Sequence, residues 1–282
     1  MNDFQADSLG LSTAALPLLG DLIHERLGLF FDKGRHDVLR DRLAPLVVEH
    51  GFDSFLDFYY LLKYDETAAA DWGRVSDALA VPETYFWREM DQIHAVVTHA
   101  VPELVKARSA EPLRIWCVPS ASGEEPLTIA MALEEAGWFE RVPIEIHGSD
   151  ASPTAIERAR AGRYRERSFR ALPPPLREKY FEREGSDSLP VPALRRRITS
   201  WSVVNLFDDA AVAARARVPI LFCRNVFIYF SEAGIRRVTE GFARVMPDPS
   251  YLCIGASESL LRVTSRFELT ELGGAFVYLK HR

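Results

Sequence analysis

The sequence is poor in cysteine and has no long hydrophobic run. Its 282 residues include three cysteines, Cys117, Cys223 and Cys253, which are far apart within apolar stretches. An odd number without zinc-type spacing argues against a disulfide framework, so we expect them to be small hydrophobic residues in buried strands. No apolar run approaches the ~20 residues that a membrane span needs, and the N-terminus lacks a charged-then-apolar signal pattern. We therefore expect a cytoplasmic protein without membrane insertion.

An excess of positive charge is also missing, since the formal net charge is −6 at pH 7. Bulk binding to nucleic acid or to an anionic membrane surface is therefore not favoured. The histidines His24, His36, His94 and His147 show no ligand spacing, and we expect no metal site.

The third missing feature is the glycine pattern of the common phosphate-binding loops. The stretch IWCVPSASGEEP, residues 115–126, is an apolar run followed by a small-residue loop, and a helical pattern follows it. It has neither Gly-x-Gly-x-x-Gly nor a Gly-Lys-Ser/Thr ending. Glu124 and Glu125 would repel a pyrophosphate, but they suit a ligand with hydroxyls, an ammonium group or a sulfonium. S-adenosylmethionine has all three and no phosphate.

A second acidic position supports this interpretation. IEIHGSD ends in Asp150, roughly one βαβ unit further on, where an acid can accept from both hydroxyls of a ribose. Simpler roles stay open: Asp150 can be the N-cap of the following helix, and Glu124 and Glu125 can complement a helix dipole.

What the sequence does contain divides into two parts. Residues 11–75 have leucines and valines at helical intervals, Gly28 and Gly51 follow apolar stretches as stops, and Asp53 or Ser54 can cap a third helix. Arg35, Arg40 and Arg42 cluster on the second of these helices. From residue 113 onward, short apolar runs alternate with helical stretches, which favours a mostly parallel sheet covered on both faces.

Two segments of the second part have special patterns. The tail from residue 267 predicts an antiparallel hairpin around Gly273-Gly274 that closes the sheet, and the run 219–230 predicts a strand with Tyr229 at its carboxyl end. Residues 163–197 carry ten Arg or Lys against five Asp or Glu, together with five prolines. They are either a small strand-rich lobe inserted into the sheet domain or a solvated loop.

Six motifs in a fixed order carry a resemblance to a known family. They are VPETYFWRE (81–89), WCVPSASGEEPLTIA (116–130), GSDASPTAIERARAGRY (148–164), NLF (205–207), FCRNVFIYF (222–230) and GASES (255–259). Together with DKGRHDVLRDRLAPLV (32–47), they resemble the chemotaxis protein glutamate O-methyltransferase (CheR) family, which methylates glutamates of chemoreceptors.

The resemblance implies an α/β fold with three parts. A helical N-terminal domain would occupy residues 1–76, and a linker that contacts the cofactor would occupy residues 77–98. A class I, Rossmann-like methyltransferase sheet would occupy residues 99–282, with a β-subdomain inserted at about 163–200.

The resemblance also implies the site residues. S-adenosylmethionine, which leaves as S-adenosylhomocysteine, would contact Thr84, Arg88, Glu125, Asp150, Asn205, Leu206, Arg224 and Asn225. Arg88 and Tyr229 would flank the reacting carboxylate, and Arg35, Arg40 and Arg42 would face the receptor. From the residues alone, Tyr229 can instead be a core tyrosine with a satisfied hydroxyl, and Arg88 a surface partner of Glu89 or Asp91.

Departures from the family pattern define an alternative. Pro82 stands where the family usually has asparagine, and Pro119-Ser120 replaces a glycine followed by cysteine or serine, which stiffens the loop. The alternative is a weakly active or inactive adaptor that binds receptors or partners in a chemosensory pathway. The lobe has only Gly185 where a pentapeptide-binding loop would have two glycines, so we expect no docking on a receptor C-terminal pentapeptide. We also expect a monomer.

Overall fold

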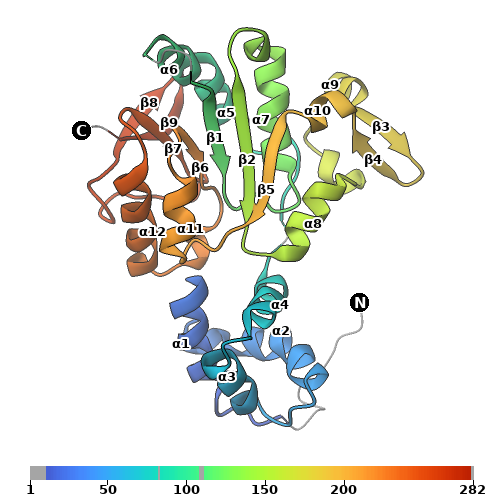
Figure 1. The fold of residues 1–282 in the computed structure, drawn as a ribbon, viewed down its shortest axis with the longest axis vertical. Coiled ribbons are helices and arrows are strands. Elements are labelled where there is room, and N and C mark those ends of the chain that lie inside the picture. The colour runs from blue at the N-terminus through green and yellow to red at the C-terminus, as the bar shows by residue number, and fades with distance from the viewer. Residues whose placement is uncertain (1–10, 82, 108–110, 281–282) are drawn as a thin grey trace.

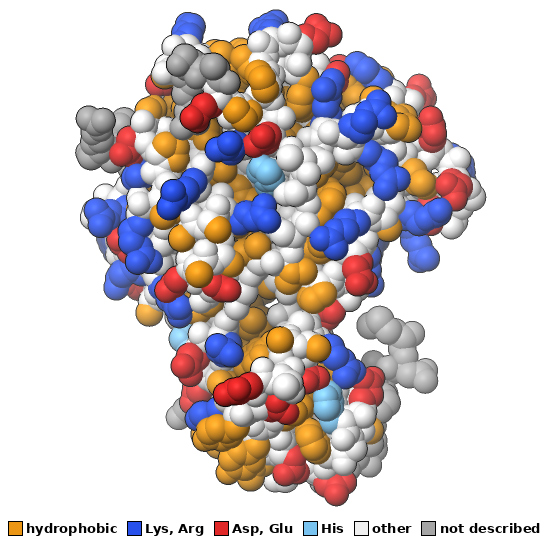
Figure 2. Space-filling model, in the orientation of Figure 1, with side chains coloured by type: hydrophobic (Ala, Val, Ile, Leu, Met, Phe, Trp, Pro, Cys, Tyr) orange, Lys and Arg blue, Asp and Glu red, His pale blue; other side chains and the backbone are white. Residues whose placement is uncertain are grey.

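The structure is a computed structural model that describes residues 11–81, 83–107 and 111–280. Figure 1 shows a sheet domain with a smaller helical domain below it, and Figure 2 shows the narrow waist where the two meet. Among the described residues, no helix has the length and apolar character needed to cross a bilayer.

Four helices build the N-terminal domain around their own core. They are α1 (Leu16–Leu27), α2 (His36–Glu49), α3 (Phe55–Tyr64) and α4 (Ala69–Leu79), with a short turn of helix, η2 (Lys33–Arg35), before α2. The predicted stop at Gly28 is confirmed: Gly28 has a φ of +78°, and a Cβ there would come within 2.0 Å of Phe207 in the sheet domain. Ser54 caps α3 by accepting from the backbone N–H of Asp57, as predicted. The domain boundaries at residues 76 and 98 stay predictions.

The sheet has seven strands in the order β5-β2-β1-β6-β7-β9-β8. The parallel strands are β5 (Ile198–Val203), β2 (Ile144–Asp150), β1 (Leu113–Cys117), β6 (Ile220–Phe222) and β7 (Ser250–Cys253). β8 (Glu268–Leu272) and β9 (Ala275–Lys280) form the predicted antiparallel hairpin, which closes the sheet against β7. This is the α/β class that the alternating pattern predicts.

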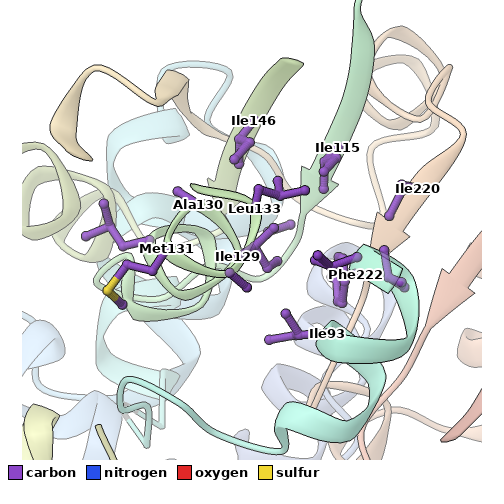
Figure 3. Close-up of a cluster of buried hydrophobic side chains, with 14 of the residues drawn as sticks. Ile93, Ile115, Ile129, Ala130, Met131, Leu133, Ile146, Ile220 and Phe222 are labelled. Atoms are coloured by element: carbon purple, nitrogen blue, oxygen red, sulfur yellow. The ribbon is translucent and has the colours of Figure 1, made fainter. Parts of the chain in front are cut away.

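Helices cover both faces of the sheet because successive side chains of each strand point to opposite sides. On one face of the sheet, Ile115 lies in a core that four helices complete: α5 (Met90–Ala95), η3 (Val96–Ala100), α6 (Val101–Ala107) and α7 (Glu124–Glu135). Figure 3 shows part of this core. Trp116 lies in the core on the other face, with α11 (Asp209–Arg215) and α12 (Glu232–Val245). α8 (Pro153–Ala161) follows β2, and η4 (Trp138–Glu140) follows α7.

The three cysteines are free and buried, as predicted, although Cys223 directly follows β6 rather than lying within it. Burial raises the pKa of each thiol, so all three stay protonated.

The basic segment is a folded lobe, so the alternative of a solvated loop is wrong. It contains one hairpin, β3 (Phe181–Glu184) and β4 (Asp187–Pro190), together with η5 (Glu166–Phe169), α9 (Pro174–Tyr180) and α10 (Pro192–Arg195). It is less rich in strands than expected because two of its prolines begin helices, at Pro174 and Pro192, where a missing N–H costs nothing.

The predicted strand over 219–230 is also wrong in its second half. β6 ends at Phe222, and a loop and the short helix η6 (Phe227–Tyr229) follow. Asn225 has a φ of +60°, which no strand residue adopts, and the carboxylate of Glu258 accepts the backbone N–H groups of Asn225 and Phe227. Contacts from a distant segment therefore override the β-propensity of this run.

Candidate active site

A cavity of about 380 Å³ lies between the carboxyl ends of the parallel strands and the helical domain. This volume is within the usual range for small-molecule sites. Its sheet wall consists of residues after β1, β2, β5 and β6, and its helical wall of residues 27–42 and 76–81. Such a crevice beyond the strand ends is where open α/β sheets bind their ligands.

The structure brings nearly all the predicted site residues together. Those that line the cavity are Thr84, Arg88, Glu125, Asp150, Asn205, Leu206, Arg224, Asn225, Tyr229, Arg35 and Arg42. Arg40 does not line it; its guanidinium faces Asp37 and Asp41. The functional roles of these residues stay predictions. Pro82, on which the adaptor hypothesis partly rests, lies outside the described residues.

The loop after β1 is held close to the end of β2. The backbone N–H of Ser120 donates to the carbonyl of Ser149 at 2.7 Å, and that of Ala121 donates to Asp150 Oδ2 at 2.9 Å. Gly123 has a φ of +99°, and a Cβ there would come within 2.8 Å of Trp201. α7 then begins at Glu124 with Pro126 in its first turn, so the predicted strand, loop and helix are confirmed.

The two glutamates at the start of α7 point in different directions. Glu124 is 2% exposed and accepts from the hydroxyls of Ser122 and Ser168, away from the cavity. Glu125 lines the cavity with its Oε2 3.2 Å from Arg224 Nη1. Burial raises the pKa of both carboxyls; hydrogen bonds oppose this at Glu124, and the charge of Arg224 opposes it at Glu125.

Asp150 does not cap α8, because the N-cap is Ser152, whose hydroxyl accepts from the backbone N–H of Ala155. The Asp150 carboxylate instead accepts from the N–H groups of Ala121 and Ser152, each at 2.9 Å. Burial raises the pKa of this carboxyl, and these hydrogen bonds oppose the shift. Asp150 is thus fixed at the cavity with lone pairs left for a ligand.

Arg224 is the buried cation of the site, with 4% of its surface exposed. Its Nη2 lies 3.1 Å from Glu89 Oε2, and its Nη1 pairs with Glu125. Sequence reasoning treated Glu89 only as a partner of Arg88 and missed this contact, because the two residues are 135 positions apart. No local spacing signals it.

Arg88 contacts Glu89, as one alternative predicts, and also lies on the cavity. Its Nη1 donates to the carbonyl of Glu83 at 2.7 Å and its Nε lies 3.6 Å from Glu89 Oε1, while the side chain lines the cavity. Tyr229 is half-buried, and its hydroxyl has no hydrogen-bond partner within the described ranges. The alternative of a core tyrosine with a satisfied hydroxyl is therefore wrong.

A second carboxylate that the sequence did not reveal holds the segment before Tyr229. Glu258 accepts backbone N–H groups from Gly255, Asn225, Phe227 and Ile228, at 2.6 to 3.3 Å. It lies in the GASES motif, and a carboxylate in the loop directly after a strand is the signal that could have pointed to it. This side chain fixes the backbone that presents Arg224 and Tyr229.

The helical domain is tied to the mouth of the cavity. Phe30 donates its backbone N–H to the carbonyl of Tyr229 at 2.8 Å, and the Asn205 amide donates to the carbonyl of Arg26 at 2.6 Å. On the other side, Asp77 of α4 accepts from the hydroxyl and backbone N–H of Thr154. The helical wall is therefore held in place by bonds to the same segments that carry predicted site residues.

The residues present fit S-adenosylmethionine. Four buried polar atoms of cavity-lining residues make no hydrogen bond to the described residues: Ser120 Oγ, Glu125 Oε1, Arg224 Nε and Arg224 Nη1, the last of which has only its ion pair with Glu125. Buried polar groups are rarely left unpaired, so these atoms are suited to hydrogen-bond a ligand. An acceptor and a donor pair of this kind suit an ammonium and a carboxylate, and Asp150 suits a ribose.

Comparison with known proteins agrees with this geometry. Residues 14–79 match the family described as "CheR methyltransferase, all-alpha domain", and residues 82–275 match "CheR methyltransferase, SAM binding domain". Chemotaxis protein methyltransferase 2 of Vibrio cholerae is 30% identical over 262 residues, which cover 92% of this chain and 90% of that protein. Chemotaxis protein methyltransferase 1 of Pseudomonas aeruginosa is 26% identical over 279 residues, which cover 96% and 99% respectively. The chain therefore belongs to the CheR methyltransferase family and is an S-adenosylmethionine-dependent methyltransferase.

Proposed function

We propose that this enzyme methylates glutamate side chains on the cytoplasmic helices of chemoreceptor-like proteins, forming glutamate methyl esters. The observation that carries the proposal is the group of unpartnered buried atoms of Glu125 and Arg224 beside Asp150, with Tyr229 on the same cavity. Chemotaxis in the names of the relatives supports the substrate class.

The chemistry requires positioning more than proton transfer. When bound, S-adenosylmethionine supplies a methyl group activated by its sulfonium. A glutamate carboxylate is already ionised near neutral pH, so the protein needs no general base. Its tasks are to align the carboxylate and to exclude water, and good alignment alone is worth several kcal/mol, roughly 7 to 11 in favourable cases.

Within this proposal, each predicted residue has a role. Glu125 accepts from the cofactor's ammonium group, Arg224 binds its carboxylate, and Asp150 accepts from its ribose hydroxyls. The remaining predicted cofactor residues are Thr84, Arg88, Asn205, Leu206 and Asn225. The free hydroxyl of Tyr229 donates to one oxygen of the substrate carboxylate, and the guanidinium of Arg88 balances its charge.

The helical wall receives the receptor. Arg35 and Arg42 line the cavity, Arg40 lies on another face of α2, and Phe30, Val38 and Val81 expose apolar side chains nearby. This mixture of cations and apolar groups suits an amphipathic acidic helix.

We further propose that the enzyme is a cytoplasmic monomer and does not dock on a C-terminal pentapeptide. Its domain boundaries would lie at residues 76 and 98.

The test is transfer of a labelled methyl group from S-adenosylmethionine to receptor cytoplasmic fragments. We expect incorporation that base releases, because methyl esters hydrolyse readily. No incorporation across several receptor fragments, with cofactor binding intact, would contradict the substrate assignment. No observation in the described residues favours the adaptor hypothesis, and the loop containing Pro119 is tied to β2 rather than displaced from the cavity.

A further inference from the structure

Glu89 occupies an unusual position beside the cavity. It lies directly before α5, and its φ is +49°, while that of Trp87 is +70°. Non-glycine residues with positive φ are uncommon and concentrate at functional sites, because the surrounding contacts must hold them there. Glu89 does not line the cavity, so any effect it has on a ligand must act through other side chains.

The carboxylate of Glu89 contacts groups that do line the cavity. Its Oε2 accepts from Arg224 Nη2 at 3.1 Å, and its Oε1 accepts from the Asn225 amide at 3.3 Å. The backbone N–H of Ala256 also donates to Oε2, at 3.1 Å. One side chain thus joins the segment of Arg88 to the loops after β6 and β7.

These contacts fix how Arg224 faces the cavity. Nη2 is fully used, because the carbonyls of Arg88 and Glu89 also accept from it, at 3.0 and 3.3 Å. The guanidinium is planar, so anchoring Nη2 also fixes Nε, which has no hydrogen-bond partner, and Nη1, which forms an ion pair with Glu125 but no hydrogen bond. Although burial alone would raise it, the charge and hydrogen bonds of Arg224 lower the pKa of Glu89, which therefore stays ionised.

We propose that Glu89 is a positioning residue for the cofactor: it orients Arg224 and Asn225 so that Arg224 presents Nε and Nη1 to the carboxylate of the methionine end. This inference rests on the proposed assignment of Arg224 to that carboxylate. It predicts an effect confined to one end of the cofactor, since Asp150 at the ribose end has no contact with Glu89.

The test uses two ligands that differ only at that end. S-adenosylhomocysteine carries the amino-acid group, whereas 5′-methylthioadenosine keeps the adenosine and the thioether without it. In Glu89→Gln, which preserves shape and removes the charge, we expect S-adenosylhomocysteine to bind about 10- to 100-fold more weakly. We expect binding of 5′-methylthioadenosine to change less than about twofold, and Glu89→Asp to recover part of the loss.

A matched control is Glu240→Gln, because Glu240 accepts from Arg266 and Thr264, and none of these residues lines the cavity. It should leave both dissociation constants unchanged. Calorimetry measures S-adenosylhomocysteine directly, and competition against it measures 5′-methylthioadenosine.

Each result decides the matter. An equal loss for both ligands in Glu89→Gln would mean that Glu89 only supports the cleft, and no loss for either would mean that Arg224 is oriented without it; both outcomes overturn the inference and leave the proposed function intact. If Arg224→Lys leaves S-adenosylhomocysteine binding unchanged in the otherwise unaltered protein, the assignment of Arg224 itself fails.

Discussion

The sheet wall of the cavity holds a buried cluster of charges, whereas the helical wall combines exposed apolar side chains with the cations Arg35 and Arg42. Arg224 is 4% exposed and paired with two carboxylates, while Phe30 and Val81 on the helical wall are 48% and 49% exposed. Preorganised, desolvated groups raise the affinity for a small ligand of fixed shape. A large protein substrate instead needs an accessible surface, so this contrast supports the proposal that the cofactor binds the sheet wall and the receptor the helical wall.

The largest expected effect comes from removing the cation of the sheet wall. In Arg224→Ala, Glu89 and Glu125 lose their partner, and breaking a buried pair of this kind typically costs about 3–5 kcal/mol of stability. S-adenosylhomocysteine binding should fall by at least about 100-fold. Urea unfolding and calorimetry measure the two quantities.

The matched control for stability is Arg266→Ala, since Arg266 pairs with Glu240 but is 59% exposed. It should change both quantities little. If Arg224→Ala is too unstable to assay, Arg224→Lys keeps the charge and loses the planar fork, and should still weaken binding. Retained affinity in both Arg224 variants would show that the sheet wall is not built for this ligand.

The contrast between the walls also explains how much the sequence could predict. Glu125 and Asp150 were predictable because a parallel sheet brings the carboxyl ends of its strands to one edge: Asp150 ends β2, and Glu125 lies at the start of the helix after β1. Glu89 and Glu258 were not predictable, because their partners are distant in the sequence and carry no periodic signal.

The structure differs from the sequence-based expectation in two places. The run after Phe222 has β-branched and aromatic residues, yet Glu258 takes the N–H groups that a neighbouring strand would use. The lobe was expected to be rich in strands, yet Pro174 and Pro192 begin helices. In each case a tertiary contact or a helix start outweighed the preference of single residues.

The next largest effect should come from Tyr229, which lies where the two walls meet. Tyr229→Phe removes a hydroxyl that has no partner in the described part of the chain, so stability should be unaffected. If this hydroxyl aligns the substrate carboxylate, kcat should fall about 10- to 100-fold, since small misalignment has effects of this size. Affinity for S-adenosylhomocysteine should not change.

Tyr251→Phe provides the comparison, because the buried Tyr251 hydroxyl donates to Glu103 at 2.6 Å, away from the cavity. It should lower stability and leave kcat unchanged. The same kcat for Tyr229→Phe and the unmodified enzyme would remove Tyr229 from the mechanism.

Substitutions of Arg40 and Arg42 on α2 should have smaller effects that differ from each other. Arg42 donates to the carbonyls of Ala78 and Ala80 at the end of α4, so Arg42→Glu should weaken the packing of the helical domain as well as receptor methylation. Arg40 pairs with Asp37 and Asp41 on its own helix and does not line the cavity, so Arg40→Glu should weaken receptor methylation more than cofactor binding.

For Arg40→Glu we expect the KM for a receptor fragment to rise about three- to tenfold, more at low salt, because an exposed charge contributes little and is screened. The dissociation constant of S-adenosylhomocysteine should stay the same. Equal effects on receptor and cofactor would mean that the helical wall does not serve the receptor specifically.

The smallest effect concerns the carboxylate behind the sheet wall. Burial raises the pKa of Glu124 above its ordinary value of 4.5, although Ser122 and Ser168 donate to it. The folded protein therefore binds this proton more tightly than the unfolded chain does. The stability that Glu124 contributes is complete below pH 4.5 and is lost as the pH rises through the raised pKa.

The glutamine of Glu124→Gln cannot titrate. The free energy of unfolding of this variant should therefore increase relative to that of the unmodified protein as the pH rises above 4.5. Glu135, at the other end of α7, gives the opposite sign: hydrogen bonds from Lys179 and Tyr180 lower its pKa. Glu135→Gln should therefore lose stability relative to the unmodified protein at neutral pH, with the difference fading as the pH falls through the lowered pKa. Urea unfolding at a series of pH values measures both differences. If the difference in free energy of unfolding changed with pH in the same direction for both variants, burial of Glu124 would not govern its protonation.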